Sequence, residues 1–169
     1  MLEVTRIYLV GFMGSGKTTT GKRLAERLGM DFTDVDEEIE KREGVRIADI
    51  FRLKGEDYFR ELESRLLRDL SLRENVVIAT GGGIVEREEN RNFLKSTGIV
   101  IWLYISWDEL ANRGIICDVS RPVSMRPDLK YIYVRRNFFY KEIADIKVVV
   151  DKKSEEEIVG EICGYLEKN

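Results

Sequence analysis

The amino-acid sequence predicts an α/β fold in which a parallel β-sheet is covered by helices on both faces. Short strand-like runs alternate along the chain with amphipathic helical stretches, and this alternation is typical of parallel sheets. The run Val76-Val77-Ile78-Ala79 is apolar throughout, as expected for a strand that is buried on both sides. Ligands of such sheets bind at the carboxyl ends of the strands. Glycine-rich or acidic segments follow several of the predicted strands, so we expect one functional edge.

The predicted strands are short runs in which apolar and β-branched residues dominate. They cover residues 6–10, 31–35, 76–80, 99–105 and 147–150. The run 99–105 is continuously apolar, which fits a strand that is buried on both sides.

The predicted helices are the segments with amphipathic patterning between these strands. They cover residues 17–28, 36–43, 45–53, 56–72, 86–95, 107–113, 128–143 and 155–166. Gly29 ends the first helix, as glycine commonly does at a helix C-cap. The long helix 56–72 carries an apolar stripe at near-fourfold spacing, formed by Phe59, Leu62, Leu66 and Leu70. Residues 114–127 show poor periodicity, so we expect an irregular segment there.

Composition excludes several classes of protein. The 169 residues fit one domain, and a net charge of −3 with interspersed signs argues against broad nucleic-acid binding. The longest apolar run has seven residues, too few to span a membrane, and no leader pattern precedes the first strand. We therefore expect a cytoplasmic protein, and its size and mixed charge favour a monomer. The chain has no histidine, and Cys117 and Cys163 lack metal-ligand spacing, which excludes the common zinc sites.

The strongest motif is the phosphate-binding loop from Gly11 to Thr18, which follows a predicted strand and opens a predicted helix. Its glycines let backbone N–H groups point at phosphate oxygens, and the helix dipole adds to the attraction. Lys17 is expected to reach the β- and γ-phosphates of ATP, and Thr18 to ligate Mg²⁺. The motifs Asp-x-x-Gly and Asn-Lys-x-Asp are absent from the sequence, which argues against a GTPase.

Further candidates follow the other strands, each with an ordinary structural alternative. The carboxylates of Asp34 and Asp36 are expected on one side of an extended segment, or they belong to an acidic helix start. Arg60 and Glu63 are spaced to pair on a helix, which surface ion pairs also do. The triplet 81–83 allows close approach of a ligand to the backbone, although it also suits a flexible turn.

Arginines mark the irregular segment and the helix after it. Arg113, Arg121 and Arg126 suggest a lid that covers phosphates and excludes water. Arg135 and Arg136 lie just beyond, where a solvated helix face is the alternative.

Taken together, these residues resemble shikimate kinases, which belong to the nucleoside-monophosphate-kinase-like group. The resemblance extends over nearly the whole chain. It rests on the motifs Gly11–Thr18, Asp34-x-Asp36, Phe59-Arg60-x-x-Glu63, Gly81-Gly82-Gly83, Arg121-Pro122 and Arg136 four residues before Tyr140. It implies a three-layer α/β/α fold with a five-stranded sheet in the order 2-3-1-4-5. A helical substrate-binding region at about 33–61 and a lid at about 113–126 are also implied.

The resemblance also implies an activity, namely transfer of the ATP γ-phosphate to the 3-hydroxyl of shikimate in aromatic amino-acid biosynthesis. The implied catalytic residues are Lys17, Asp36 and Arg121, with Asp36 as the base. Mg²⁺ would be held by Thr18 and, through water, by Asp34. Shikimate would be bound by Asp36, Arg60, Arg136 and the glycines at 81, 82 and 83, with Glu63 orienting Arg60.

ATP would be bound by the phosphate loop and by residues near the adenine. The implied set is Gly14, Ser15, Gly16, Lys17, Thr18, Thr19, Arg113, Arg121 and Lys153. Arg113 would stack on the adenine, and residues 151–154 would border it. One departure concerns the lid, because Val123-Ser124 follows Arg121-Pro122 where the family usually has two apolar residues.

Two other functions remain open from the residues alone. A kinase for another small hydroxylated acid, such as gluconate, would need similar arginines. A nucleotide-binding regulatory module without transfer activity is the alternative outside the enzymes.

Overall fold

The computed structural model describes residues 5–116 and 122–168, and this part of the chain holds a five-stranded sheet. Its strands are β1 (Arg6–Val10), β2 (Asp31–Asp34), β3 (Val76–Ala79), β4 (Ile99–Tyr104) and β5 (Ile146–Val149). They lie in the order β2-β3-β1-β4-β5, and all neighbouring pairs are parallel. The predicted α/β class and the strand order implied by the resemblance are therefore confirmed.

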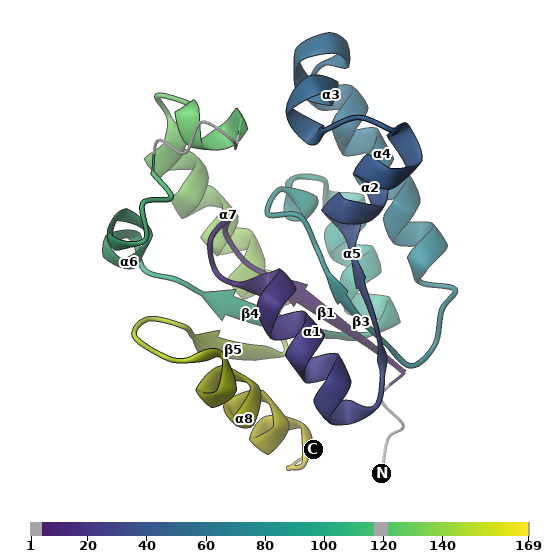
Figure 1. Ribbon diagram of the computed structural model, residues 1–169, viewed down its shortest axis with the longest axis vertical. Helices are drawn as coiled ribbons and strands as arrows, with labels where there is room; N and C mark the ends of the chain where they lie inside the picture. Colours follow the sequence, from purple (N-terminus) through teal and green to yellow (C-terminus); the bar gives the residue numbers. More distant parts are fainter. Residues whose placement is uncertain (1–4, 117–121, 169) are drawn as a thin grey trace.

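Helices cover the sheet on both faces (Figure 1). On one face α1 (Lys17–Leu28) packs against α8 (Glu155–Leu166), and on the other α5 (Glu88–Thr97) packs against α7 (Leu129–Ile143). The short helix α6 (Trp107–Asn112) follows β4. The central strand β1 is enclosed by these layers, and its residues 7–10 have no exposed surface. This burial explains why the strand carries no charged side chain after Arg6.

Three further helices form a separate group beyond the carboxyl ends of the strands. They are α2 (Val35–Glu43), α3 (Ile47–Lys54) and α4 (Glu56–Leu70), and Figure 1 shows them rising above the sheet next to one another. Phe59, Leu66 and Leu70 of the predicted apolar stripe are buried, and Leu62 is half-buried. Two 3₁₀ turns, η1 (Ile84–Glu86) and η2 (Pro122–Met125), complete the described elements.

The element boundaries differ from prediction where a polar residue ends or begins a helix. The helix predicted from residue 86 begins at Glu88, because the backbone at Arg87 is extended and η1 precedes it. The long helix ends at Leu70 rather than at residue 72, and Leu72 is 84% exposed, so no packing extends the helix there. Among the described residues no helix is both long and apolar enough to cross a bilayer.

The strand order places the candidate residues at one edge. The phosphate loop leaves β1, the glycine triplet leaves β3, and Asp34 ends β2, so three neighbouring strands deliver their ends to one place. Parallel pairing in register, with Leu9 opposite Ala79 and Asp34 also opposite Ala79, brings these ends level. The topology therefore assembles the predicted edge.

Candidate active site

The phosphate loop connects β1 to α1 in a conformation suited to an anion. Gly16 precedes the helix at φ 84°, a left-handed value that glycine adopts readily, and no side chain caps the helix. The first N–H groups of α1 are therefore left for another acceptor, and its first turn carries no acidic residue. Lys17 folds back over the loop, and its Nζ donates to the carbonyls of Gly11 and Phe12 at 2.8 and 3.1 Å. The loop thus leaves backbone N–H groups free of side-chain caps at the place where the sequence predicts a phosphate.

Asp34 connects the phosphate loop to the start of α2. Its Oδ2 accepts a hydrogen bond of 2.5 Å from the hydroxyl of Thr18, so the two predicted magnesium-binding residues are in contact. Its Oδ1 accepts from the backbone N–H groups of Asp36 and Glu37. Asp34 is thus the N-cap of α2.

The expectation of an extended segment at residues 34–36 is wrong. The strand ends at Asp34 and the helix begins at Val35, with no residue between them, because Asp34 caps the helix directly. The acidic helix start, which was the alternative, is what the structure has. Asp36 nonetheless lies next to Asp34, because an N-cap and the second helical residue are close in space.

Asp36 and Glu63 form a buried acidic pair beside Gly81. A Cβ atom at Gly81 would lie 2.6 Å from Glu63 Oε1 and 2.8 Å from Asp36 Oδ1, so both oxygens converge on this glycine. Neither oxygen has a hydrogen-bond partner among the described residues. Burial, followed by the charges of Glu63 and Asp34, raises the pKa of Asp36 to about 7, although Lys17 and Arg60 oppose the shift. Burial likewise raises the pKa of Glu63, against the opposing charge of Arg60.

Arg60 lies across the glycine turn and is fixed by two carboxylates. Its Nη1 donates to Glu63 at 2.5 Å and its Nη2 to Glu56 at 3.1 Å. The side chain is 9% exposed, so this is not the surface ion pair that was the alternative. The guanidinium covers Gly83 so closely that a Cβ atom there would lie 2.5 Å from Nη2. Any larger side chain at this position would displace the guanidinium.

Arg136 comes from α7 and is buried, with its side chain 3% exposed. The solvated helix face that was the alternative applies only to Arg135, whose side chain is 43% exposed. Arg136 Nε donates to Glu86 at 2.7 Å, and a Cβ at Gly82 would lie 3.6 Å from its Nη1. One turn later along α7, the Tyr140 hydroxyl donates to the Gly82 carbonyl. The helix and the glycine turn are therefore joined at two points.

These side chains surround a cavity of about 580 Å³, which we call the strand-end cavity. Eight of the predicted site residues line it, namely Thr18, Asp34, Asp36, Arg60, Gly81, Gly82, Gly83 and Arg136. Met13, Phe51, Phe59 and Val123 add apolar surface to the same walls. The cavity thus joins one end of the phosphate loop to two aspartates and to three arginines, of which Arg46 was not among the predicted site residues. Its walls suit a small anionic, hydroxylated ligand.

The residues predicted near the adenine lie on the other side of the phosphate loop. Arg113 donates to the carbonyls of Gly14 and Val150 at 3.2 and 3.4 Å, and so spans the phosphate loop and the end of β5. Lys153 follows β5 and pairs with Glu161 at 2.5 Å. Neither lines the strand-end cavity. Arg121, the predicted lid residue, lies outside the described residues.

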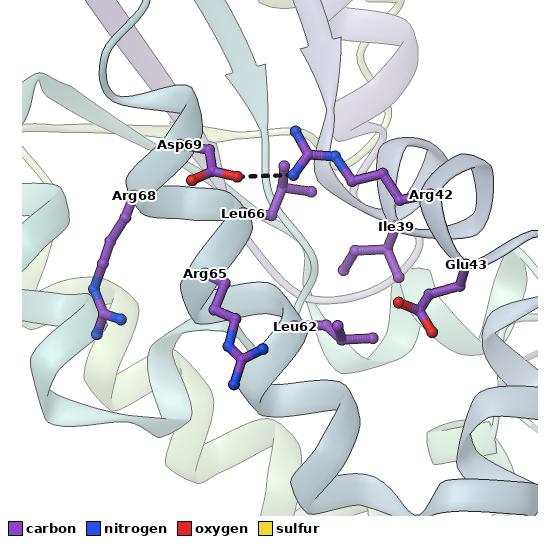
Figure 2. Close-up of a pocket in the computed structure, with 8 residues that line it drawn as sticks. All are labelled: Ile39, Arg42, Glu43, Leu62, Arg65, Leu66, Arg68 and Asp69. Atoms are coloured by element: carbon purple, nitrogen blue, oxygen red, sulfur yellow. Dashed lines mark hydrogen bonds and ion pairs between the residues drawn. The ribbon is translucent and has the colours of Figure 1, made fainter.

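A second hollow of about 400 Å³ lies between α2 and α4 (Figure 2). Ile39, Leu62 and Leu66 form its apolar floor. The charged groups at its rim pair with protein partners, as Arg42 does with Asp69 at 2.8 Å. None of the predicted site residues lines this hollow, and the strand-end cavity remains the candidate active site.

Sequence reasoning missed two carboxylates that hydrogen-bond to the arginines of the cavity, Glu86 to Arg136 and Glu56 to Arg60. Glu86 was placed at the start of a predicted helix, where an acidic residue is unremarkable, and no spacing in the sequence connects it to Arg136. Glu56 was also missed, although its i, i+4 spacing to Arg60 is a signal that could have identified the pair.

Comparisons with known proteins agree with this geometry. A family model described as shikimate kinase matches residues 13–167. The chain is similar to a shikimate kinase of Aquifex aeolicus, with 48% identity over 168 residues that cover 97% of each chain. It is also similar to a shikimate kinase of Persephonella marina, with 46% identity over 95% of this chain and 98% of the relative. A solved structure, "Shikimate kinase from Acinetobacter baumannii in complex with shikimate", superposes with a TM-score of 0.91 at 37% identity, over 98% of this chain and 94% of the other.

Proposed function

The chain belongs to the shikimate kinase family of ATP-dependent kinases, and we propose that its strand-end cavity binds shikimate for transfer of the ATP γ-phosphate to the 3-hydroxyl. The observation that carries this proposal is the composition of a single cavity. Thr18 of the phosphate loop, the carboxylate of Asp36 and the guanidinium groups of Arg60 and Arg136 line the same walls. ATP, as the phosphoryl donor, and the acceptor hydroxyl can therefore meet in this cavity without rearrangement of the sheet.

The two arginines bind the carboxylate of shikimate in this proposal. Both flank the glycine turn, one next to Gly83 and the other next to Gly82. The planar guanidinium group matches a carboxylate with two parallel hydrogen bonds, and burial strengthens that attraction. The missing side chains at Gly81 and Gly83 let the carboxylates of Asp36 and Glu63 and the guanidinium of Arg60 lie directly against the backbone of the glycine turn.

Asp36 accepts the proton of the attacking hydroxyl. Asp36 lines the strand-end cavity, so a substrate hydroxyl bound there can donate to its carboxylate. With its pKa raised to about 7, the carboxyl is ionised in a large fraction of molecules near neutral pH and is a stronger base than an ordinary aspartate.

Thr18 and Asp34 fit Mg²⁺, which prefers oxygen ligands. Their contact of 2.5 Å places a hydroxyl and a carboxylate together at the start of α1. Bound Mg²⁺ neutralises charge on the phosphates during transfer. Lys17 and Arg121 are proposed to stabilise the transferring group. Arg113, Lys153 and the loop residues Gly14, Ser15, Gly16 and Thr19 are proposed to bind the rest of ATP.

Another hydroxylated acid remains the competing acceptor, since two arginines recognise any carboxylate. Release of ADP from ATP should be followed in a coupled assay with shikimate, gluconate and no acceptor. We expect stimulation by shikimate alone. Equal rates with and without shikimate, at millimolar acceptor, would refute the proposal, and stimulation by gluconate alone would reassign the acceptor. We further propose that the protein is cytoplasmic and monomeric. Gel filtration across a concentration series tests the oligomeric state.

A further inference from the structure

Glu86 connects two arginines of α7 to the turn that follows the glycine triplet. Its Oε1 accepts from Arg136 Nε at 2.7 Å, and its Oε2 accepts from Arg135 Nη2 at 2.6 Å. The carboxylate is 15% exposed, and the hydrogen bonds from the two arginines lower its pKa in spite of its partial burial. Glu86 is therefore a charged acceptor at neutral pH.

This contact fixes the orientation of the Arg136 guanidinium. Among the described residues Glu86 is its hydrogen-bonded partner, and the bond uses Nε on one edge of the group. No acceptor within the described part of the chain bonds to Nη1 or Nη2. Arg136 also lines the strand-end cavity, and Nη1 points toward Gly82. The two-nitrogen fork is thus available to a ligand carboxylate.

We propose that Glu86 is a positioning residue for acceptor binding, which presents the fork of Arg136 to the substrate carboxylate. The proposal rests on the function proposed above, in which Arg136 binds that carboxylate. The turn that carries Glu86 directly follows the glycines that line the cavity. The backbone N–H of Glu86 donates to the Gly83 carbonyl at 3.1 Å. The Tyr140 hydroxyl holds α7 to the same turn. Helix α7 is therefore held against the cavity wall at two points, by Glu86 and by the Gly82 carbonyl.

Two effects of Glu86 oppose each other, and this opposition makes the proposal testable. As an acceptor it orients Arg136, which favours binding. As an anion it offsets part of the positive charge of Arg136 and repels a substrate carboxylate, which weakens binding. Orientation requires an oxygen at the observed distance, whereas charge compensation requires only a nearby negative group.

Two conservative variants separate these effects. Glu86→Gln keeps an oxygen that Nε can bond but removes the charge. Glu86→Asp keeps the charge but withdraws the carboxylate by one methylene, about 1.5 Å. Because α7 is tied to the turn by Tyr140, the backbone does not follow to restore the contact. Both variants keep a polar group near the buried arginine, so both are expected to fold.

Calorimetric titration of the full chain with shikimate provides the measurement. Glu86→Asp is expected to raise the Kd for shikimate about tenfold, the effect of weakening one charge-assisted hydrogen bond. Glu86→Gln is expected to bind within about threefold of the wild type. Glu89→Gln is the matched control, since Glu89 pairs only at the surface with Arg68 and Arg87, and its Kd should be unchanged. The opposite order of the two Glu86 variants would overturn the proposal.

A double-mutant cycle tests whether Glu86 acts through Arg136. In an Arg136→Ala background, Glu86→Asp should cause no additional rise in the Kd for shikimate. A further tenfold loss in that background would show that Glu86 acts otherwise and would overturn the proposal. If the wild-type chain itself fails to bind shikimate, the proposed function fails instead. Normal wild-type binding with an unaffected Glu86→Asp variant refutes the role of Glu86 alone.

Discussion

Substitution of Gly83 by alanine should displace Arg60 without straining the backbone. The backbone at Gly83 has φ −91° and ψ 6°, which alanine can adopt. The added methyl would overlap the guanidinium group, with Nη2 only 2.5 Å away. Ordinary contact starts near 3.4 Å, so the guanidinium must move by about 1 Å. Arg60 is held between Glu63 and Glu56, and a move of this size breaks its alignment toward the cavity.

The expected kinetic effect is large and confined to one substrate. Misplacement of a binding group by about 1 Å can reduce turnover efficiency by about a hundredfold. We therefore expect kcat/KM for shikimate to fall by roughly that factor, while the KM for ATP changes less than about threefold. Initial rates at saturating ATP with varied shikimate, and the reverse, provide both values.

Two controls show whether the displaced arginine is the cause. Gly164→Ala, in α8, adds a methyl that meets nothing within 4 Å, and its kinetic constants should match the wild type. In an Arg60→Ala background the methyl at Gly83 has room, so Gly83→Ala should add little further loss. A folded Gly83→Ala variant with wild-type kcat/KM for shikimate would refute the geometry described here.

Four further predictions concern other groups of the cavity. Arg136→Ala should raise the KM for shikimate by about 100-fold, because a charge-assisted bidentate contact is lost, while the KM for ATP stays nearly unchanged. Equal losses for both substrates would contradict the role of Arg136. Because Asp36 must be ionised to act as base, kcat/KM for shikimate should rise with pH up to about 7 and then level off, and a flat profile from pH 5 to 8 would contradict that role. The pKa of Asp36 is higher in the folded chain than in the unfolded chain. Its contribution to the free energy of unfolding therefore falls as pH rises from about 4 to about 7. Asp36→Asn should thus be inactive yet melt at a higher temperature than the wild type at pH 8, with no such gain at pH 4, as calorimetry without ligands would measure. Thr18→Ala should raise the Mg²⁺ concentration needed for half-maximal rate, and an unchanged requirement would argue against its place at the metal.

Much of the fold could be predicted because its elements have strong local signals. The boundaries of β1, α1 and α8 match the predictions, since each is marked by a continuous apolar run, a glycine or a serine cap. The sequence could not show where β2 gives way to α2, because Asp34 is compatible both with a strand end and with an N-cap. That choice depends on Thr18, sixteen residues away, which holds the other oxygen of the carboxylate.

Part of the candidate site could also be predicted from the sequence. Motif residues at the strand ends were found because the fold brings parallel strand ends together and because they resemble a known family. Glu86 was not found, since its role depends on a contact with Arg136, fifty residues later, that only the packing of α7 on the glycine turn creates. Local sequence carries no signal for such a contact.

Identification of the reaction product tests the proposed phosphoryl transfer most directly. The protein should be incubated with ATP, Mg²⁺ and shikimate, and the mixture should be analysed by phosphorus and proton nuclear magnetic resonance alongside the ADP formed. We predict one phosphorylated shikimate for each ADP, with the phosphate coupled to the proton at carbon 3. Release of ADP with inorganic phosphate as the product, or a phosphate on another oxygen, would contradict the proposed transfer from ATP at the phosphate loop to the 3-hydroxyl of shikimate in the strand-end cavity.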